Sequence, residues 1–362
     1  MAVDPIPASV IKKLLEEIYT GNTDLDRKLF KETAKRLMAG VTEGFGKDFP
    51  KIKYNSPDFE LLDKLTYNAA TFAAFKNHSQ IRETVRLLKD GDGNLRSKGE
   101  FIKEALKLDK TYNKRYLSVE YDQAVTSGRM AKKWADAVRT ENLYPNLTYV
   151  AVMDDRTRPM HRKWHGVTLP IGHKFWDTHY PPNDWACRCS IRRTDKAADD
   201  KGLNVNDMPA LPKQFNINVG KEGKVFDQNH PYFKTPSFNS VATVAKKALL
   251  RYQTGTYYPK LKETVTGVYK SDLGTVTVNN TGLEKSLSQP HRRAYFKNNL
   301  LHRLPELIAD AVYIGSAAST KSPHWKYYHY LRLTDFDDMM LVFREDHKGR
   351  LFHYSIVDKE KS

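Results

Sequence analysis

The chain of 362 residues carries 59 Lys and Arg against 43 Asp and Glu, which gives a formal net charge of +16. No stretch approaches the roughly 20 apolar residues of a membrane span, and the N-terminus lacks a secretion signal, so we expect a protein made in the cytoplasm. Such a basic chain is attracted to polyanions, of which nucleic acid is the natural candidate. Its length predicts more than one hydrophobic core, because single domains usually hold about 100 to 200 residues.

Residues 1–146 have the pattern of packed amphipathic helices. Apolar side chains recur there at spacings of three and four residues, with polar residues between them, as at Leu14, Leu15 and Ile18. The sequence Tyr144-Pro145-Asn146 ends the last of these helices. We expect this helical N-terminal region to be a scaffold without chemistry of its own.

A short strand and a helix are expected next. The run 147–153 is rich in β-branched and aromatic residues, which favours a strand. Thr157 is a suitable helix cap, a proline suits the first turn, and Gly166 suits the end of the helix. In such a helix His161 and His165 lie one turn apart on the same face.

Both cysteines of the chain, Cys187 and Cys189, follow this helix. A disulfide across one intervening residue would be strained and would close almost no loop, so we interpret them as thiols or metal ligands. In an extended segment, residues two apart point to the same side. With His161 and His165 they would complete a tetrahedral structural zinc site. The alternative is a metal-free polar cluster, in which the histidines bond backbone carbonyls or nearby acidic side chains.

The motif around these residues resembles the Mu F-like head morphogenesis domain of tailed-phage minor head proteins. The residues that carry the resemblance are Asp154-x-Arg156-Thr157-Arg158-x-x-His161, Gly166, Phe175-Trp176 and Pro181-Pro182-x-Asp184-Trp185-x-Cys187-Arg188-Cys189. The resemblance extends over roughly residues 14–232. It implies a protein of the phage procapsid, present in a few copies near the portal, with a role in head assembly or in the fate of the packaged DNA.

Residues 147–236 are therefore expected to form a small α+β head-morphogenesis domain, and residues 237–262 a linker. The third region, residues 263–362, combines helices with an antiparallel sheet. A helical stretch is expected at 288–311, broken near Pro305. The segments expected to be strands are 264–266, 276–278, 327–333, 339–344 and 351–357. The last three are joined by short loops and must be antiparallel, so the chain is predicted to belong to the α+β class.

Six of the 12 histidines fall between His291 and His353, interleaved with Arg, Lys and Tyr. Metal-independent RNA cleavage needs a base, an acid and cations for the phosphorane, and these residue types can supply all three. Alternatively, the polar residues form the solvent face of a half-buried sheet, as in any small antiparallel domain.

The third region also resembles phage-borne nuclease-like modules that are grouped with barnase, EndoU, the colicin RNases and RelE. The resemblance rests on Gly282-Leu283-x-Lys285, His291 and Arg344-Glu345-Asp346-x-Lys348-Gly349, and it covers about residues 265–357. By position it implies Lys285 and His291 as catalytic candidates from the helices. It implies Arg332, His353 and Ser355 as candidates from the sheet. Chemistry of this kind needs no cofactor.

These features predict a phage virion protein that is present in the host cytoplasm during assembly. It would be a minor head protein whose C-terminal domain is an RNase-like effector delivered with the DNA. The expected partners are portal, scaffold or capsid proteins and nucleic acid. Two alternatives stay open: a purely structural portal-binding or DNA-binding protein without catalysis, and a polymorphic toxin.

Overall fold

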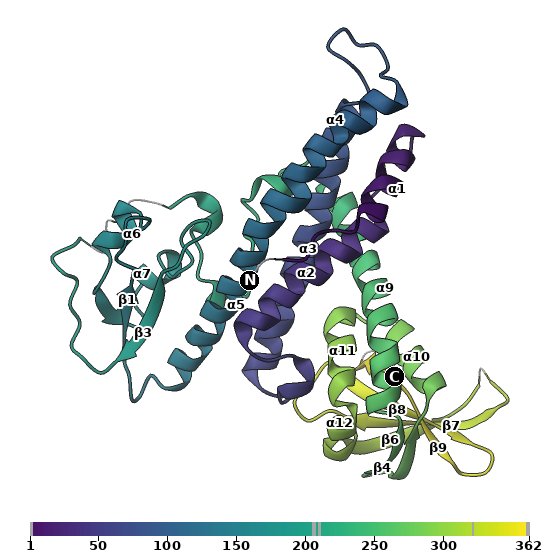
Figure 1. Cartoon of the computed structure of the whole chain (residues 1–362). Coiled ribbons are helices and arrows are strands. Elements are labelled where there is room, and N and C mark those ends of the chain that lie inside the picture. The colour runs from purple at the N-terminus through teal and green to yellow at the C-terminus, as the bar shows by residue number, and fades with distance from the viewer. Residues whose placement is uncertain (1–2, 205–207, 209–210, 321, 360–362) are drawn as a thin grey trace. The chain divides into compact units, whose positions relative to one another are not determined.

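The computed structural model describes residues 3–204, 208, 211–320 and 322–359 (Figure 1). The chain divides into two compact units, one made of residues 1–48 and 64–248 and the other of residues 49–63 and 249–362. The predicted α+β class is confirmed, because long helices are combined with two separate sheets. Among the described residues, no helix is both long and apolar enough to cross a membrane.

Helices dominate the first unit, as the N-terminal pattern predicts. They are α1 (Ala8–Tyr19), α2 (Arg27–Phe45), α3 (Pro57–Arg86, shared with the second unit), α4 (Lys98–Lys110), the π-helical turn η2 (Thr111–Tyr116) and α5 (Leu117–Arg139). α2 and α5 cross at glycines. A Cβ atom on Gly44 would lie 1.9 Å from the carbonyl oxygen of Val125, and one on Gly128 would lie 2.3 Å from that of Val41. Only glycine therefore permits this close backbone approach.

A small antiparallel sheet follows the helices. Its strands are β1 (Asn146–Val150), β2 (Thr168–Pro170) and β3 (Ser190–Thr194), in the order β2-β1-β3. Between and after them come the short elements α6 (Pro159–Lys163), α7 (Phe175–Thr178), η3 (Lys213–Phe215), α8 (Val219–Glu222) and η4 (Pro231–Phe233). The core beside the sheet is aromatic, with Tyr149, Trp164, Trp176 and Tyr180 almost fully buried. The strand expected at 147–153 is confirmed as β1, whereas the expected helix is only the five residues of α6.

The second unit contains a six-stranded sheet in the order β4-β5-β9-β8-β7-β6. Its strands are β4 (Gly267–Ser271), β5 (Gly274–Val278), β6 (Val312–Ala318), β7 (Trp325–Arg332), β8 (Met339–Asp346) and β9 (Leu351–Asp358). Its helical elements are η1 (Phe49–Lys51), α9 (Phe238–Thr264, which begins in the first unit), α10 (Asn280–Ser288), α11 (Ala294–Leu300), η5 (Leu301–Arg303) and α12 (Leu304–Asp310). α10 packs against β9 and α12 against β4.

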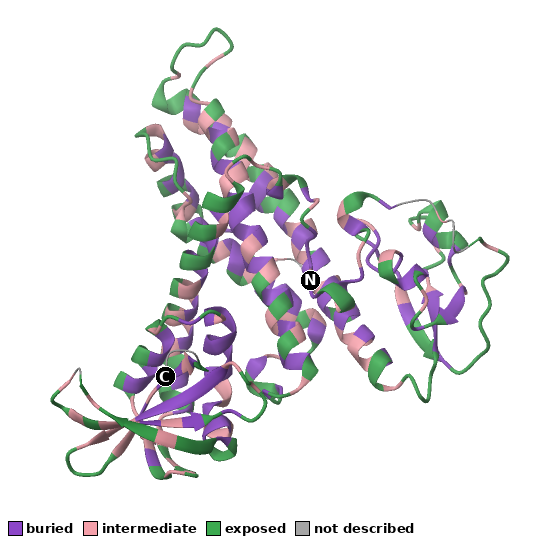
Figure 2. Cartoon of the chain, turned by 180° about the vertical axis from the view of Figure 1, so that it is seen from behind, coloured by how far each residue is buried: buried purple, intermediate pink, exposed green. Residues whose placement is uncertain are grey.

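The predicted meander is confirmed as β7, β8 and β9, which pair antiparallel in sequence order. Residues 339–343 of β8 are all buried, so the centre of the sheet is covered at that end (Figure 2). The strand expected at 264–266 is wrong, because α9 runs through Thr264 and β4 begins at Gly267. β6 was not expected from the sequence, and most of the linker expected at 237–262 lies within α9.

Candidate metal centre and C-terminal pocket

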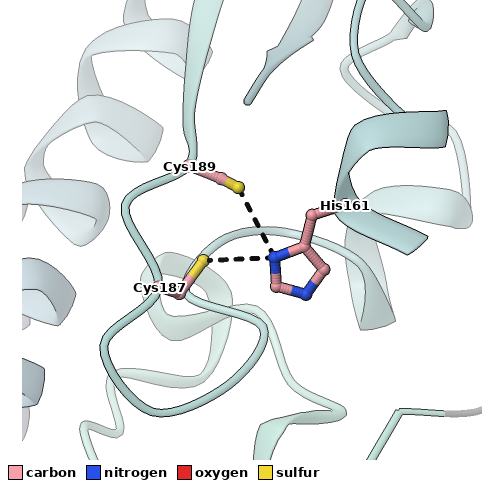
Figure 3. Close-up of side chains that lie close together, drawn as sticks. All are labelled: His161, Cys187 and Cys189. Carbon is pink, nitrogen blue, oxygen red and sulfur yellow. Dashed lines mark hydrogen bonds between the residues drawn. The ribbon is translucent and has the colours of Figure 1, made fainter. Parts of the chain in front are cut away.

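His161, Cys187 and Cys189 converge in the first unit (Figure 3). His161 lies on α6, and the two cysteines lie on the segment that leads into β3. The Nδ1 atom of His161 lies 3.8 Å from the Sγ atom of Cys187 and 3.5 Å from that of Cys189. All three ligand atoms lie within 4.8 Å of one another, and all three residues are buried. The group could therefore hold a metal ion.

The spacing of this group fits tetrahedral zinc. Zn–S bonds of about 2.3 Å and Zn–N bonds of about 2.0–2.1 Å place sulfur and nitrogen ligands about 3.6 Å apart. The two measured nitrogen-to-sulfur distances, 3.5 and 3.8 Å, bracket that value. Two sulfurs and one imidazole also form a donor set that zinc prefers. The three side chains leave the fourth position of a tetrahedral ion for water or an external group.

The interaction between the two thiols shifts their pKa values in opposite directions. A hydrogen bond from the Cys189 thiol, followed by one from His161, lowers the pKa of Cys187, while burial opposes this shift. The same interaction with Cys187 raises the pKa of Cys189. The hydrogen bonds at Cys187 thus favour its thiolate, which is the form that binds metal ions.

Two ion pairs fasten the cysteine segment to the segment that precedes His161. Arg188 donates to both carboxylate oxygens of Asp154, at 2.6 and 2.7 Å. Arg158 approaches Asp184 at 2.8 Å and donates to the backbone carbonyl of Trp185 at 2.9 Å. Asp154 therefore pairs mainly with Arg188, because the guanidinium of Arg156 approaches it only to 3.9 Å. Bidentate pairing of this kind fixes geometry as well as charge.

The structure does not bring His165 into the group. α6 ends at Lys163, and Gly166 adopts a left-handed backbone with φ of 86°. His165 is exposed, and its Nδ1 accepts a hydrogen bond from the backbone N–H of Ala151 at 3.2 Å. Thr157 does not cap the helix. Its hydroxyl instead donates to the backbone carbonyl of Val152.

In the second unit, two of the five catalytic candidates are enclosed without lining a pocket. His291 has its Nε2 atom 3.2 Å from Asp358, and its Nδ1 accepts from the backbone N–H of Arg293 at 2.9 Å. Ser355 is fully buried and donates to the carbonyl of Ile356 at 3.0 Å. Neither is open to a substrate in this structure.

A third candidate, His353, is 2% exposed, and neither of its ring nitrogens has a hydrogen-bond partner among the described residues. Burial, together with the nearby charge of Lys297, lowers the pKa of His353 to about 3. Lys297 is itself enclosed and donates to the carbonyl of Gln289 at 2.8 Å. Burial lowers the pKa of this lysine to about 7. The sequence analysis did not identify Lys297 as a candidate, because a lysine on a helix is usually an exposed surface charge.

The last two catalytic candidates, Lys285 and Arg332, are both exposed, but they do not line the same cavity. Lys285 on α10 lines a cavity of about 270 Å³, which His353 also lines. Arg332 lies at the end of β7, opposite Val312 and Met340 in the strand ladders, and does not line that cavity. The full lining is Asn279, Thr281, Gly282, Glu284, Lys285, Ser288, Trp325, Arg344, Phe352, His353 and Tyr354. Lys285 and His353 are thus the only pair of the five candidates that this pocket brings together.

Arg344 is the pocket residue whose role as a candidate was missed. In the strand ladders it lies opposite Tyr328 on β7 and Phe352 on β9. The sequence did offer one sign of this residue. Arg344 stands in a strand whose neighbouring strands are rich in Tyr, Trp and Phe. The sequence could not show that these rings would surround the guanidinium, because that depends on the register of three strands.

Residues 76–192 match the family model described as "Phage Mu protein F like protein", and residues 245–354 match the model described as "Large polyvalent protein-associated domain 3". The resemblance to Mu F-like head proteins is thereby supported over the first stretch, which contains His161, Cys187 and Cys189. The description of the second model names no nuclease.

Two curated proteins are similar to part of the chain. The chain is 35% identical over 116 residues to "Putative capsid assembly protein F" of Escherichia phage Mu, covering 31% of this chain and 26% of that protein. It is 36% identical over 77 residues to "Mu-like prophage FluMu F protein" of Haemophilus influenzae, covering 21% of this chain and 19% of that protein. The chain thus spans about a quarter or less of the length of these relatives. No solved structure matches it.

Proposed function

We propose that this chain is a phage minor head protein that acts in head morphogenesis, near the portal and in contact with portal, scaffold or capsid proteins. The observation that carries the proposal is the 35% identity over 116 residues to a protein described as acting in capsid assembly. Residues 76–192, which match the family model, contain helices and a small sheet that belong to one compact unit.

Within this function, His161, Cys187 and Cys189 have a structural role. They bring α6 together with the segment before β3, two short pieces that the ion pairs Arg188–Asp154 and Arg158–Asp184 also join. When bound, a zinc ion would supply a cross-link between these two pieces. Arg188 and Asp154 orient the same two pieces from outside the group. We therefore assign the group to the integrity of the head-assembly domain and not to catalysis.

The experiment that tests the function is deletion of this chain from the phage that encodes it, with complementation in trans. We expect the deletion to abolish or strongly reduce infectious particles, and the complementing chain to be found by mass spectrometry in purified virions and in procapsids. Lys270→Gln, a change at an exposed residue of β4, serves as the complementing control. Normal titres without the chain, together with its absence from purified heads, would overturn the proposal.

For the second unit we propose an RNase-like effector that is carried in the virion and delivered with the DNA. The favouring observation is the pocket that Lys285 and His353 share, in which Lys285 is the exposed cation and His353 is held neutral by burial. The enclosure of His291 and Ser355 leaves Lys285 and His353 as the pair to test first. No metal is needed for this chemistry.

The test is cleavage of total RNA by the purified full chain in the presence of a chelator. We expect cleavage that Lys285→Gln removes and Lys270→Gln retains. Binding of nucleic acid without cleavage would favour the purely structural alternative. Growth arrest of a phage-free host on expression of the chain, lost in Lys285→Gln, would instead favour the toxin alternative.

A further inference from the structure

The guanidinium of Arg344 is stacked on aromatic rings in the second unit. Its central carbon lies 3.4 Å from the centre of the Tyr354 ring, 5.2 Å from that of Tyr328 and 5.5 Å from that of Trp325. Arginine gains from such contacts through the negative faces of the rings. Three rings from two strands, β7 and β9, thus hold one guanidinium in position at the pocket, which Arg344 also lines.

Arg344 has no polar partner within the described part of the chain. Its Nε atom is buried and makes no hydrogen bond, and no described carboxylate or carbonyl accepts from its other donors. A guanidinium offers five donors in a fork that matches a carboxylate or a phosphate. Leaving a buried donor unsatisfied is costly. An oxyanion bound from outside would satisfy these donors.

Lys285 adds a second positive charge to the same pocket. Its side chain is exposed on α10 and has no partner among the residues that the structure describes. The acidic residue in the lining is Glu284, which accepts a hydrogen bond from the Tyr258 hydroxyl. The pocket therefore carries two uncommitted cations against one carboxylate that already has a partner, and its charge favours an anion.

The rim of the pocket is aromatic. The rings of Trp325 and Phe352 both line it, with their centres 5.8 Å apart and their planes at 67°. Both residues are half-buried, so part of each ring remains accessible. Nucleobases stack on such rings in proteins that bind single strands, and each stacked base adds to the affinity. An inorganic anion would use the cations but not these rings.

We propose that this pocket binds one nucleotide of single-stranded nucleic acid, with its phosphate on Arg344 and Lys285 and its base against Trp325 and Phe352. The cavity of about 270 Å³ would hold one nucleotide of the strand at a time. A duplex keeps its bases stacked on each other and cannot offer one to the rim. The inference deepens the proposed nucleic-acid role of the second unit, but it requires binding only and not cleavage.

Fluorescence anisotropy with the full chain and a labelled single-stranded oligonucleotide tests the proposal. We expect Arg344→Gln and Lys285→Gln each to weaken binding about tenfold, because each removes a charge-assisted contact to phosphate. Arg344→Gln should also reduce the salt dependence by about one released counterion. Trp325→Ala should weaken binding to a similar degree through loss of stacking. Lys270→Gln, which removes the same charge from an exposed site on β4, is the matched control.

The competitors distinguish the sources of the anion. We expect an unlabelled single strand to compete well, and inorganic phosphate or a duplex of the same sequence to compete poorly. Equal binding by Arg344→Gln and Lys270→Gln would overturn the proposal, as would a preference for the duplex. If circular dichroism shows that Arg344→Gln is unfolded, Lys285→Gln and Trp325→Ala decide the matter.

The outcome is separable from the RNase proposal. Single-strand binding that depends on Arg344 without any RNA cleavage would uphold the pocket and refute the nuclease. RNA cleavage by the parent, together with unchanged single-strand binding in Arg344→Gln and Trp325→Ala, would uphold the nuclease and refute the pocket.

Discussion

Arg188 donates two hydrogen bonds to Asp154, at 2.6 and 2.7 Å, and so joins the two halves of the motif that carries the candidate metal ligands. These hydrogen bonds hold the pKa of Asp154 well below its usual range, so the carboxylate stays charged in any ordinary buffer. The pair lies outside the group of ligand atoms but fixes the segment on which both cysteines lie.

Asp154→Asn should weaken metal binding. Outer-shell partners that orient ligands typically change metal affinity by about ten- to a hundredfold when they are lost. We expect a loss of about tenfold for Asp154→Asn, measured by competition with a chromogenic zinc chelator. Asp155→Asn, at the exposed neighbouring residue, is the matched control. If both variants bind zinc as the parent does, Arg188 and Asp154 do not position the site.

The buried pair of Lys76 and Glu120 should be the most sensitive charge pair of the helical region. Their side chains are 1% and 4% exposed, and Lys76 also donates to the carbonyl of Tyr112 at 2.7 Å. Burial lowers the pKa of Lys76 and raises that of Glu120, while each partner opposes the shift in the other. Glu120→Gln leaves a buried ammonium without its counterion and should lower the free energy of unfolding by about 3–5 kcal/mol.

Urea unfolding monitored by circular dichroism measures this loss. The control is Glu104→Gln, which breaks a pair with Lys107 whose side chains are 35% and 65% exposed. A surface pair of that kind contributes less than about 1 kcal/mol. Equal losses in the two variants would show that Lys76 and Glu120 are solvated in solution.

Two glycine substitutions should have opposite effects, one at the crossing of α2 and α5 and one away from it. Gly128→Ala would place a Cβ atom 2.3 Å from the carbonyl oxygen of Val41, so the helices must separate. We expect a destabilisation of about 1–3 kcal/mol, as for other overpacked cores. Gly99 lies in α4 with open space around it, and Gly99→Ala should stabilise the chain by about 0.5–1 kcal/mol. Thermal unfolding of both variants tests the crossing, and a Gly128→Ala variant as stable as the parent would contradict it.

The enclosed histidines should make stability fall on acidification. The pKa of His353 is lowered from 6.5 to about 3 and that of His230 to about 4, in both cases mainly by burial. Between these values and pH 6.5 the unfolded chain binds protons that the folded chain does not, so the free energy of unfolding decreases as pH falls. Each such group contributes a slope of about 1.4 kcal/mol per pH unit.

His353→Leu should remove one such slope. We expect urea midpoints between pH 6 and pH 4.5 to fall less steeply in this variant than in the parent. An unchanged pH dependence would mean that His353 is protonated or solvated in the folded chain. The measurement is a series of urea titrations at constant ionic strength, followed by tryptophan fluorescence.

The parts of the site that could be predicted from the sequence were those set by local chain geometry. Cys187 and Cys189 point to the same side because they are two apart in an extended segment, and His161 follows a proline that starts a helix. His165 could not be placed in this way, since the helix stops at Lys163 and the chain turns through the left-handed conformation of Gly166.

In the second unit, strand alternation predicted polar and apolar faces but not which face the helices cover. His353 and Ser355 share a face in that pattern, and the structure buries both beneath the helical layer. A bulge between Val342 and Phe343 shifts the pairing of β8 with β9 by one residue. The sequence of a single strand does not show where such a bulge will form, because the bulge depends on how two strands pair. The two cations of the pocket, exposed Lys285 and half-buried Arg344, come from elements about 60 residues apart.

Metal analysis of the purified full chain under reducing conditions tests the central claim most directly. We expect about one zinc ion per chain by inductively coupled plasma mass spectrometry. Cys187→Ser and Cys189→Ser should each lose the ion, and His165→Gln, which alters a histidine outside the group, should retain it. A folded chain whose two thiols are titrated as fully reduced, and which holds no zinc even after dialysis against the metal, would contradict the claim.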